Sequence, residues 1–300
     1  MFDYRYHALS LAAVLLALAV GVLIGVAIGD SDLVSSAKSG IVHDLSAEVS
    51  GAQRQVGQLR AQLAHEEAFT NDLYPIAVHG LLSGQSVGLV FLGGPSNRVN
   101  VLVREAVTQA GGNLVTVVAI REPPDLAGLA RAAAGTHYAA LGAGPSAARQ
   151  QLVERFGMLA GRQLVSGGQL VSRELISRVR NQLLSAFDGQ LGRLQGLVVM
   201  RAEPTGMTPE EAQASTAFDT GFIDGVTAAN ASTVGVELSG TEPSQVSWYQ
   251  SQDISSVDDL DTTAGQAALV YALAGSHGAY GTKSSADSLL PNVGATSTPP

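Results

Sequence analysis

The feature that most constrains this 300-residue chain is a run of 22 residues without a charged side chain, from Ala8 to Gly29. As an α-helix this run would be about 33 Å long, enough to cross a hydrocarbon core of about 30 Å. A secretory signal peptide has a shorter apolar region and ends at small residues that form a cleavage site. The following Gly29-Asp30-Ser31-Asp32 does not form such a site. We therefore predict an uncleaved transmembrane helix at residues 8–29.

The charges that flank this run predict its orientation. Arg5 precedes the run, whereas Asp30 and Asp32 follow it. Because basic residues are retained on the cytoplasmic side of a membrane, we predict that residues 1–7 form a cytoplasmic N-terminus. The rest of the chain would then lie outside the cytoplasmic membrane as a single-pass protein.

Small residues recur at every fourth position of the predicted membrane helix, at Ala17, Gly21, Gly25 and Gly29. This spacing is typical of a groove in which two membrane helices approach closely, so we predict that it is a self-association face. Glycine and alanine are also common in membrane helices generally, so the alternative is that the spacing reflects composition alone.

A second periodic pattern follows, in which apolar residues recur at alternating steps of three and four. We call these seven positions the seam: Val42, Leu45, Val49, Ala52, Val56, Leu59 and Leu63. The heptad predicts a coiled-coil stalk at residues 30–84 and a homodimer or higher homo-oligomer. Three heptads are marginal alone, but tethering two copies in a membrane raises their effective concentration. The alternative is an amphipathic helix packed on its own globular domain.

The pattern changes again after Gly84. Apolar runs at Ser86–Leu92 and Asn113–Ile120 flank a helical pattern at Asn97–Ala110, and glycines separate the three segments. This is a βαβ unit, and near-continuous apolar strands are typical of a parallel sheet covered on both faces. We predict an extracytoplasmic, doubly wound, mostly parallel and Rossmann-like α/β domain at residues 85–283.

Further elements follow in the same domain. Strands are expected at residues 194–200 and 232–238, with weaker candidates at 136–141 and 246–250, the last of which could also be a surface segment. Helices are expected at residues 147–159, 170–184, 209–229 and 262–274. Thr208 is the expected N-cap of the third of these helices and Asp261 that of the fourth. Residues 284–300 are rich in Ser, Thr and Pro, which predicts a disordered tail.

Composition excludes several classes of function. The chain has no cysteine, so disulfides, iron–sulfur clusters and thiolate nucleophiles are excluded. Its net charge of −9 provides no basic surface for nucleic acid. A dedicated Cu(I) cage is also unfavourable, because Cu(I) prefers soft sulfur ligands and the chain offers only four scattered methionines.

No motif in the chain indicates catalysis. The segments Leu92–Pro95 and Gly142–Pro145 lack the glycine spacing of a phosphate-binding loop, so we interpret them as tight turns. The acidic residues of Val257–Asp261 could bind a cation, but helix capping is the simpler interpretation. Asp219, Asp224 and Glu237 form no recognisable acid–base pair. We therefore expect a protein that is not an enzyme, with no cofactor and with metal ligands, if any, unassigned.

The order of several segments resembles the MctB-like copper transporter family of actinobacteria. The segments are Tyr6–Gly21, Phe69–Leu82, Ser256–Val270, Tyr280–Lys283, Ala286–Asp287 and Leu289–Pro291. The resemblance implies an envelope protein that contributes to copper efflux or homeostasis, as members are described as doing. It also raises the role of an outer-membrane channel. A related corynebacterial branch implies an alternative, a coiled-coil scaffold that positions or regulates a peptidoglycan hydrolase during cell separation. Because one apolar helix cannot enclose a pore, conduction by this chain alone would require many copies.

Overall fold

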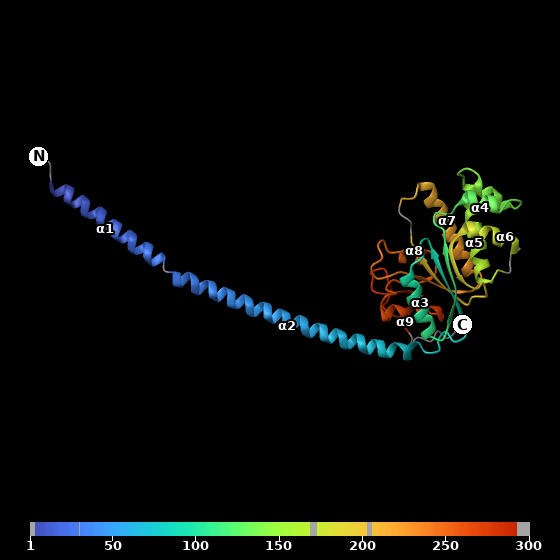
Figure 1. Ribbon diagram of the computed structural model, residues 1–300, viewed down its shortest axis with the longest axis horizontal. Coiled ribbons are helices and arrows are strands. Elements are labelled where there is room, and N and C mark those ends of the chain that lie inside the picture. Colours follow the sequence, from blue (N-terminus) through green and yellow to red (C-terminus); the bar gives the residue numbers. More distant parts are fainter. Residues whose placement is uncertain (1–3, 30, 169–172, 203–205, 293–300) are drawn as a thin grey trace. The chain divides into compact units, whose positions relative to one another are not determined.

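The computed structural model describes residues 4–29, 31–168, 173–202 and 206–292 (Figure 1). The chain divides into two compact units, residues 1–67 and residues 68–300, and we call the second unit the head. Some predicted parts lie outside the described residues: residues 1–3 of the N-terminus, residues 293–300 of the tail and the junction residue Asp30.

The first unit contains α1 (Tyr4–Ile28) and most of α2 (Ser31–Val78). Within the described part of the chain, α1 is the one helix long and apolar enough to cross a membrane, over Arg5–Ala27. This confirms the predicted apolar N-terminal helix. It begins at Tyr4, four residues before the predicted span, because the polar Tyr6 and His7 continue the helix.

The end of α2 belongs to the core of the head. Tyr74, Val78 and Leu82 are buried there. The Tyr271 hydroxyl donates to the Ala77 carbonyl at 3.0 Å, which fixes this end to α9 (Thr263–Leu273). The helix therefore ends as part of the head, although the sequence assigned residues 30–84 as one stalk.

The head is built on a seven-stranded mixed sheet with the order β3-β2-β1-β4-β5-β6-β7. The strands are β1 (Ser86–Leu92), β2 (Asn113–Ile120), β3 (Leu184–Gly189), β4 (Gly196–Arg201), β5 (Ser232–Val236), β6 (Ser255–Val257) and β7 (Ala279–Tyr280). All neighbouring pairs are parallel except β2 with β3, which is antiparallel. The mostly parallel α/β sheet was therefore predicted, whereas β3, β6 and β7 were not.

Helices cover both faces of this sheet (Figure 1). Its side chains alternate between two cores. Leu89 and Phe91 of β1 face one core, while Val90 and Leu92 face the other. The first core is covered by α3 (Asn97–Gln109), α9 and the end of α2. The second is covered by α4 (Leu126–Ala132), η1 (His137–Gly142), α5 (Ala147–Val165), α6 (Arg173–Leu183), α7 (Pro209–Thr227) and α8 (Val246–Ser251).

Glycines allow α5 and α7 to pack with their backbones almost in contact. A Cβ at Gly221 would lie 1.9 Å from the Glu154 carbonyl oxygen, and one at Gly225 would lie 2.2 Å from that of Met158. From the other side, a Cβ at Gly157 would lie 2.3 Å from the Phe218 carbonyl oxygen. Only a hydrogen atom fits at such positions, so these glycines set the distance between the two helices.

Three local expectations are wrong. Residues 136–141 form a 3₁₀ turn rather than a strand, because the Thr136 side chain accepts from the Tyr138 amide and caps η1. Residues 246–250 lie in α8, where Tyr249 is fully buried and Trp248 half-buried. Part of the predicted disordered tail is ordered: Ser288 bridges to Tyr280, and the Asp287 carboxylate accepts from the Ala279 amide at 2.9 Å.

Candidate functional site

Charged residues gather at the carboxyl ends of the parallel strands. Glu122 follows β2, Arg201 ends β4, Glu237 follows β5 and Asp258 follows β6. Parallel strands share one carboxyl edge, and open α/β sheets bind their ligands there, most often where the strand order reverses. That reversal lies between β1 and β4 in this sheet. This edge is therefore the candidate functional site, and we call it the carboxyl edge.

Arg201 is the centre of the buried charge. Its Nε donates to Asp219 Oδ2 at 2.8 Å, and its Nη1 donates to Gln245 Oε1 at 2.5 Å. The guanidinium lies 4.7 Å from the centre of the Trp248 ring, a cation–π contact. The Arg201 and Asp219 side chains are only 5% and 2% exposed, so each charge depends on the other for its stability in the interior.

Glu122 lies close to Asp219 and Arg201. Burial raises the pKa of the Glu122 carboxyl well above its usual range, and the nearby negative charge of Asp219 raises it further. Glu122 is therefore protonated at neutral pH. A neutral acid beside a carboxylate can exchange a proton, and the buried Ser215 hydroxyl lies next to Glu122.

A second buried ion pair, Glu237 with Lys283, lies in the next part of the carboxyl edge. Glu237, which is 1% exposed, accepts from the Lys283 ammonium at 2.5 Å, from the Ser244 hydroxyl at 2.7 Å and from the Gln245 amide at 2.6 Å. The Lys283 ammonium also donates to the Thr241 carbonyl at 2.7 Å. The carboxylate and the ammonium are thus satisfied within the head.

The acidic segment at residues 257–261 does not converge on a common point. Asp258 accepts from the backbone amides of Thr282 and Lys283 at 2.8 and 3.1 Å. Asp261 accepts from the Ser239 amide at 2.8 Å and from Arg98 at 3.0 Å. These contacts hold loops together, and the described residues contain no group of three acidic or histidine side chains that could hold a metal ion.

Asp261 is not the helix cap that the sequence predicts. Thr262 is the N-cap of α9, and its hydroxyl accepts from the Gly265 amide at 2.9 Å. Asp259 supports the cap by accepting from the Thr262 hydroxyl at 3.1 Å, and burial raises the pKa of the Asp259 carboxyl. In contrast, Thr208 caps α7 as predicted, with a reciprocal contact from Glu211.

A cleft of about 350 Å³ opens beside the buried charges. Its walls are formed by Pro124, Leu126, Ala127, Leu141, Gly142, Arg149, Thr208, Glu210, Glu211 and Ala214. Arg149 pairs with Glu210 across it at 2.5 Å. One thioether lies near, since Met207 Sδ accepts from the Ser215 hydroxyl at 3.6 Å. One sulfur does not make a soft metal site.

The glycine segments behave as turns. A Cβ at Gly93 would lie 2.5 Å from the Ala202 carbonyl oxygen, and Gly93 has a φ of +112°, so the turn after β1 requires glycine. Gly142 is the last residue of η1. Of the other candidate carboxylates, Asp219 is buried beside Arg201 and Asp224 is exposed on α7, so they form no acid–base pair with Glu237.

The predicted association residues lie on exposed faces. Gly21 and Gly25 have nothing within 4 Å of an added Cβ, and Ala17 is exposed on the same helix. At Gly29 an added Cβ meets only the preceding turn of its own chain, at 3.0 Å. Along the seam, the large residues from Leu45 to Leu63 are 46–63% exposed and Ala52 is exposed, whereas the side chain of Val42 lies outside the described part.

The exposed apolar stripe on α2 extends beyond the seam, to Phe69, Leu73 and Ile76. The heptad is interrupted after Leu63 because the next core positions are Glu66 and Thr70. Leu73 falls on the continued heptad, whereas Phe69 and Ile76 each lie one position before a heptad position.

Comparison with known proteins gives one family. The family model described as "Copper transport outer membrane protein, MctB" matches residues 1–291. Curated relatives described as "Copper transporter MctB", from Mycobacterium bovis and Mycobacterium tuberculosis, are 26% identical over 244 residues. These matches cover 78% of this chain and 67% of each relative.

Proposed function

Because the chain belongs to the MctB family of copper transport outer membrane proteins, we propose that it contributes to copper efflux or homeostasis in the cell envelope. The observation that carries this proposal is the match of the family model over residues 1–291, which includes the apolar helix and almost all of the head. We propose that the chain acts as a single-pass protein anchored by α1, with Arg5 on the cytoplasmic side and the head outside.

Association is the property that the exposed faces support. Large apolar side chains on α2 are stable in water only when a partner covers them, and a heptad selects another helix as that partner. We propose that two copies pair along the seam as a coiled coil, and that the groove at Ala17, Gly21, Gly25 and Gly29 pairs the membrane helices. The continuation at Phe69, Leu73 and Ile76 supports pairing up to the head.

The head is proposed to be a doubly wound, Rossmann-like module that is not an enzyme and has no cofactor. Arg201, Glu237 and Asp258 are each engaged by neighbouring groups of the head. Charges that are used in this way hold the loops of the carboxyl edge and leave little freedom to activate a substrate. A binding role for this edge is therefore favoured over a catalytic one.

Copper would then be affected through an assembly rather than through a pore made by one chain. A single apolar helix cannot enclose an aqueous path, because a membrane pore needs several helices or a closed barrel. The described residues also provide no compact soft-ligand site for Cu(I). We therefore propose that oligomers of the chain, or envelope partners bound to it, contribute to moving copper out of the cell.

The test is the copper content of cells that lack the gene. Deletion is expected to raise cell-associated copper several-fold and to sensitise growth to copper, and the full-length gene should restore both. A version in which Val49, Val56 and Leu63 are asparagine should fail to restore them. Unchanged copper content with a cell-separation defect would contradict the proposal and favour the cell-wall scaffold role.

A further inference from the structure

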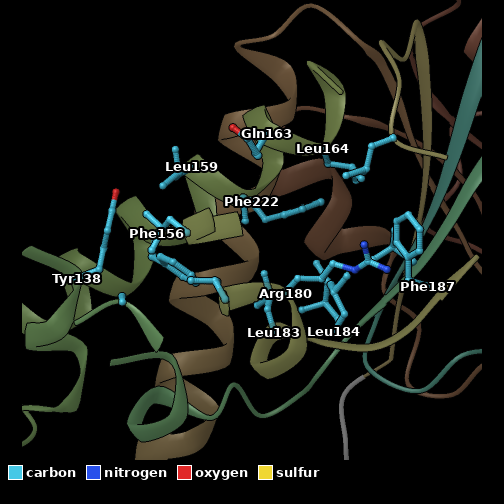
Figure 2. A pocket seen from close by; sticks show the side chains of 17 residues that line it. Tyr138, Phe156, Leu159, Gln163, Leu164, Arg180, Leu183, Leu184, Phe187 and Phe222 are labelled. Carbon is cyan, nitrogen blue, oxygen red and sulfur yellow. The ribbon is translucent and has the colours of Figure 1, made fainter. Parts of the chain in front are cut away.

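A partly open cavity of about 120 Å³ lies in the second core, on the opposite side of β2 from α3 (Figure 2). It is lined by residues of β2, α5, α6 and β3, together with Tyr138 and the buried Phe222. The seventeen residues that line it are almost all apolar, and Phe156, Leu159, Leu183 and Phe187 are among them. An apolar cavity of this kind stays dry and binds hydrocarbon, as a cavity of about 150 Å³ binds benzene.

The neighbouring strand β3 contributes two incompletely buried apolar side chains to the cavity wall. Leu184 and Phe187 of β3 are only half-buried, although they point into the cavity as parts of its wall. An alkyl chain placed there would remove water from both side chains. The volume fits a few carbon atoms rather than a whole drug-sized ligand, for which pockets measure about 300–1,000 Å³. The end of an unbranched chain is therefore the group that matches the space.

Two polar residues in this apolar lining point to a ligand with a polar head. The Gln163 amide is buried, and neither its oxygen nor its nitrogen has a hydrogen-bond partner among the described residues. Buried amides in native proteins are almost always paired, so a lone one in a cavity wall is a signal for a ligand. Figure 2 shows Gln163 on one side of the cavity and Arg180 on another.

Arg180 provides the charge. The flat face of its guanidinium lies 4.1 Å from the centre of the Phe187 ring. Stacking in this way occupies the face of the group and leaves its edge N–H donors available in the plane, which is the geometry that binds a carboxylate with two hydrogen bonds. Arg180 itself is exposed, so it lies where a head group would meet solvent.

We propose that the cavity binds a free fatty acid, with the alkyl chain between α5 and α6 and the carboxylate at Arg180. Apolar walls select the chain, and the guanidinium selects the negative head. The site is separate from the carboxyl edge, and the proposal does not depend on the role in copper homeostasis.

Photolabelling of the full-length chain in lipid nanodiscs tests the proposal. Hexanoic acid with a diazirine at the end of its chain should label residues of α5 and α6, and excess hexanoate should suppress labelling at least tenfold. Hexyltrimethylammonium, which has the same chain length and the opposite charge, should compete at least tenfold more weakly. Equal competition by the two amphiphiles, or labelling spread over the whole surface of the head, would overturn the proposal.

Variants separate the two parts of the site. Ala160→Phe fills the cavity and should abolish labelling, whereas Ala148→Phe, on an exposed position of the same helix, should not. Arg180→Gln should reduce labelling about tenfold, whereas Arg178→Gln should leave it unchanged. Because Arg180 and Arg178 are both exposed on α6, loss of folding would not explain a difference between them. Identical labelling of the two arginine variants would overturn the assignment of the carboxylate.

A lipid acyl chain is the competing source of the same chemistry. A phosphatidylcholine that carries the same diazirine chain has no free carboxylate for Arg180. It should label the cavity at least tenfold less than the free acid when both are present at equal amounts in the nanodisc. Equal or stronger labelling by the phospholipid would overturn the free-acid proposal.

Discussion

The spacing of glycines four residues apart occurs in two regions of this molecule, with opposite outcomes. In the head, Gly221 and Gly225 of α7 are filled by the backbone of α5, at 1.9 and 2.2 Å from an added Cβ. On α1, Gly21 and Gly25 have nothing within 4 Å. The same spacing thus builds an internal contact in one helix and leaves an open groove in the other. In the head, glycine spacing serves internal packing, while the described faces of the N-terminal helices stay open.

The head and α2 also differ in how their charged and apolar side chains are covered. At the carboxyl edge the buried charges of Arg201 and Glu237 are matched within the head. On α2 the large residues of the seam are about half exposed. Substitutions in the head should therefore change its folding, whereas substitutions on the open faces should change association.

The largest expected effect comes from breaking the buried ion pair. Arg201→Leu removes the cation beside the buried Asp219 carboxylate and should lower the free energy of unfolding by about 3–5 kcal/mol. Urea unfolding monitored through the single tryptophan, Trp248, measures this change close to the site. Arg98→Leu is the control, because the Arg98 side chain is 63% exposed and its pair with Asp261 should contribute at most about 1 kcal/mol. Equal losses of unfolding free energy in Arg201→Leu and Arg98→Leu would contradict a stabilising role for the buried Arg201–Asp219 pair.

Association should be the next most sensitive property. Changing Val49, Val56 and Leu63 to asparagine should weaken self-association about a hundredfold, or about 2.7 kcal/mol, because the apolar contacts of a coiled coil are lost. Fluorescence energy transfer between labelled full-length chains in vesicles measures it. The control replaces the neighbouring Gln53, Gln58 and Gln62 with asparagine. Unaltered transfer in the seam variant would show that α2 does not pair through these residues.

Gly221→Ala tests the closed helix contact. A methyl group cannot fit 1.9 Å from the Glu154 carbonyl oxygen, so the helices must separate. We expect a loss of about 1–3 kcal/mol in unfolding free energy, larger than the gain in helix propensity. Gly57→Ala on α2 has open space at its Cβ and should leave the unfolding of the head unchanged. An unchanged unfolding free energy in Gly221→Ala would mean that α5 and α7 are not held this closely.

A further effect is expected from pH. The folded-state pKa of Glu122 is raised above its unfolded value of about 4.3, so the folded state holds a proton that the unfolded state releases. The stabilising contribution of this proton is full below the unfolded pKa and is lost as pH rises through the folded pKa. Unfolding free energy should therefore fall by up to about 1.4 kcal/mol per pH unit within that window.

Glu122→Gln should remove that slope, as followed by urea unfolding at pH values from 5 to 9. Glu242→Gln is the matched control, because Glu242 also precedes a proline but is exposed. A slope that is the same in the wild type and in both variants would show that Glu122 is not the group responsible.

Helix caps and apolar strands could be predicted from the sequence because they depend on residues close together in the chain. Thr208 before Pro209, with Glu211 three positions from the cap, identifies the start of α7 because all partners lie within one turn. The apolar runs of β1, β2, β4 and β5 were found for the same reason. The short β6 and β7 carry too few residues for a pattern, and β3 is an edge strand with mostly exposed positions.

Long-range contacts account for the rest. Asp261 looks like a helix cap, but Ser239 and Arg98 bind it from segments that the sequence does not relate to it. The ionisation state of Glu122 depends on Asp219 and on burial, neither of which a linear pattern contains. The cavity between α5 and α6 likewise depends on how three elements pack. The family resemblance was visible in sequence because it follows the order of segments rather than their contacts.

The burial of Tyr74, Val78 and Leu82 has a mechanical consequence. These residues are part of the core, and Tyr271 and Thr263 of α9 hold the same end of α2 through Ala77 and Asn71. The final turns of α2 cannot rotate about the helix axis without rearranging α9. Torque or tension applied to this end of α2 would therefore be transmitted through the core to the central strands.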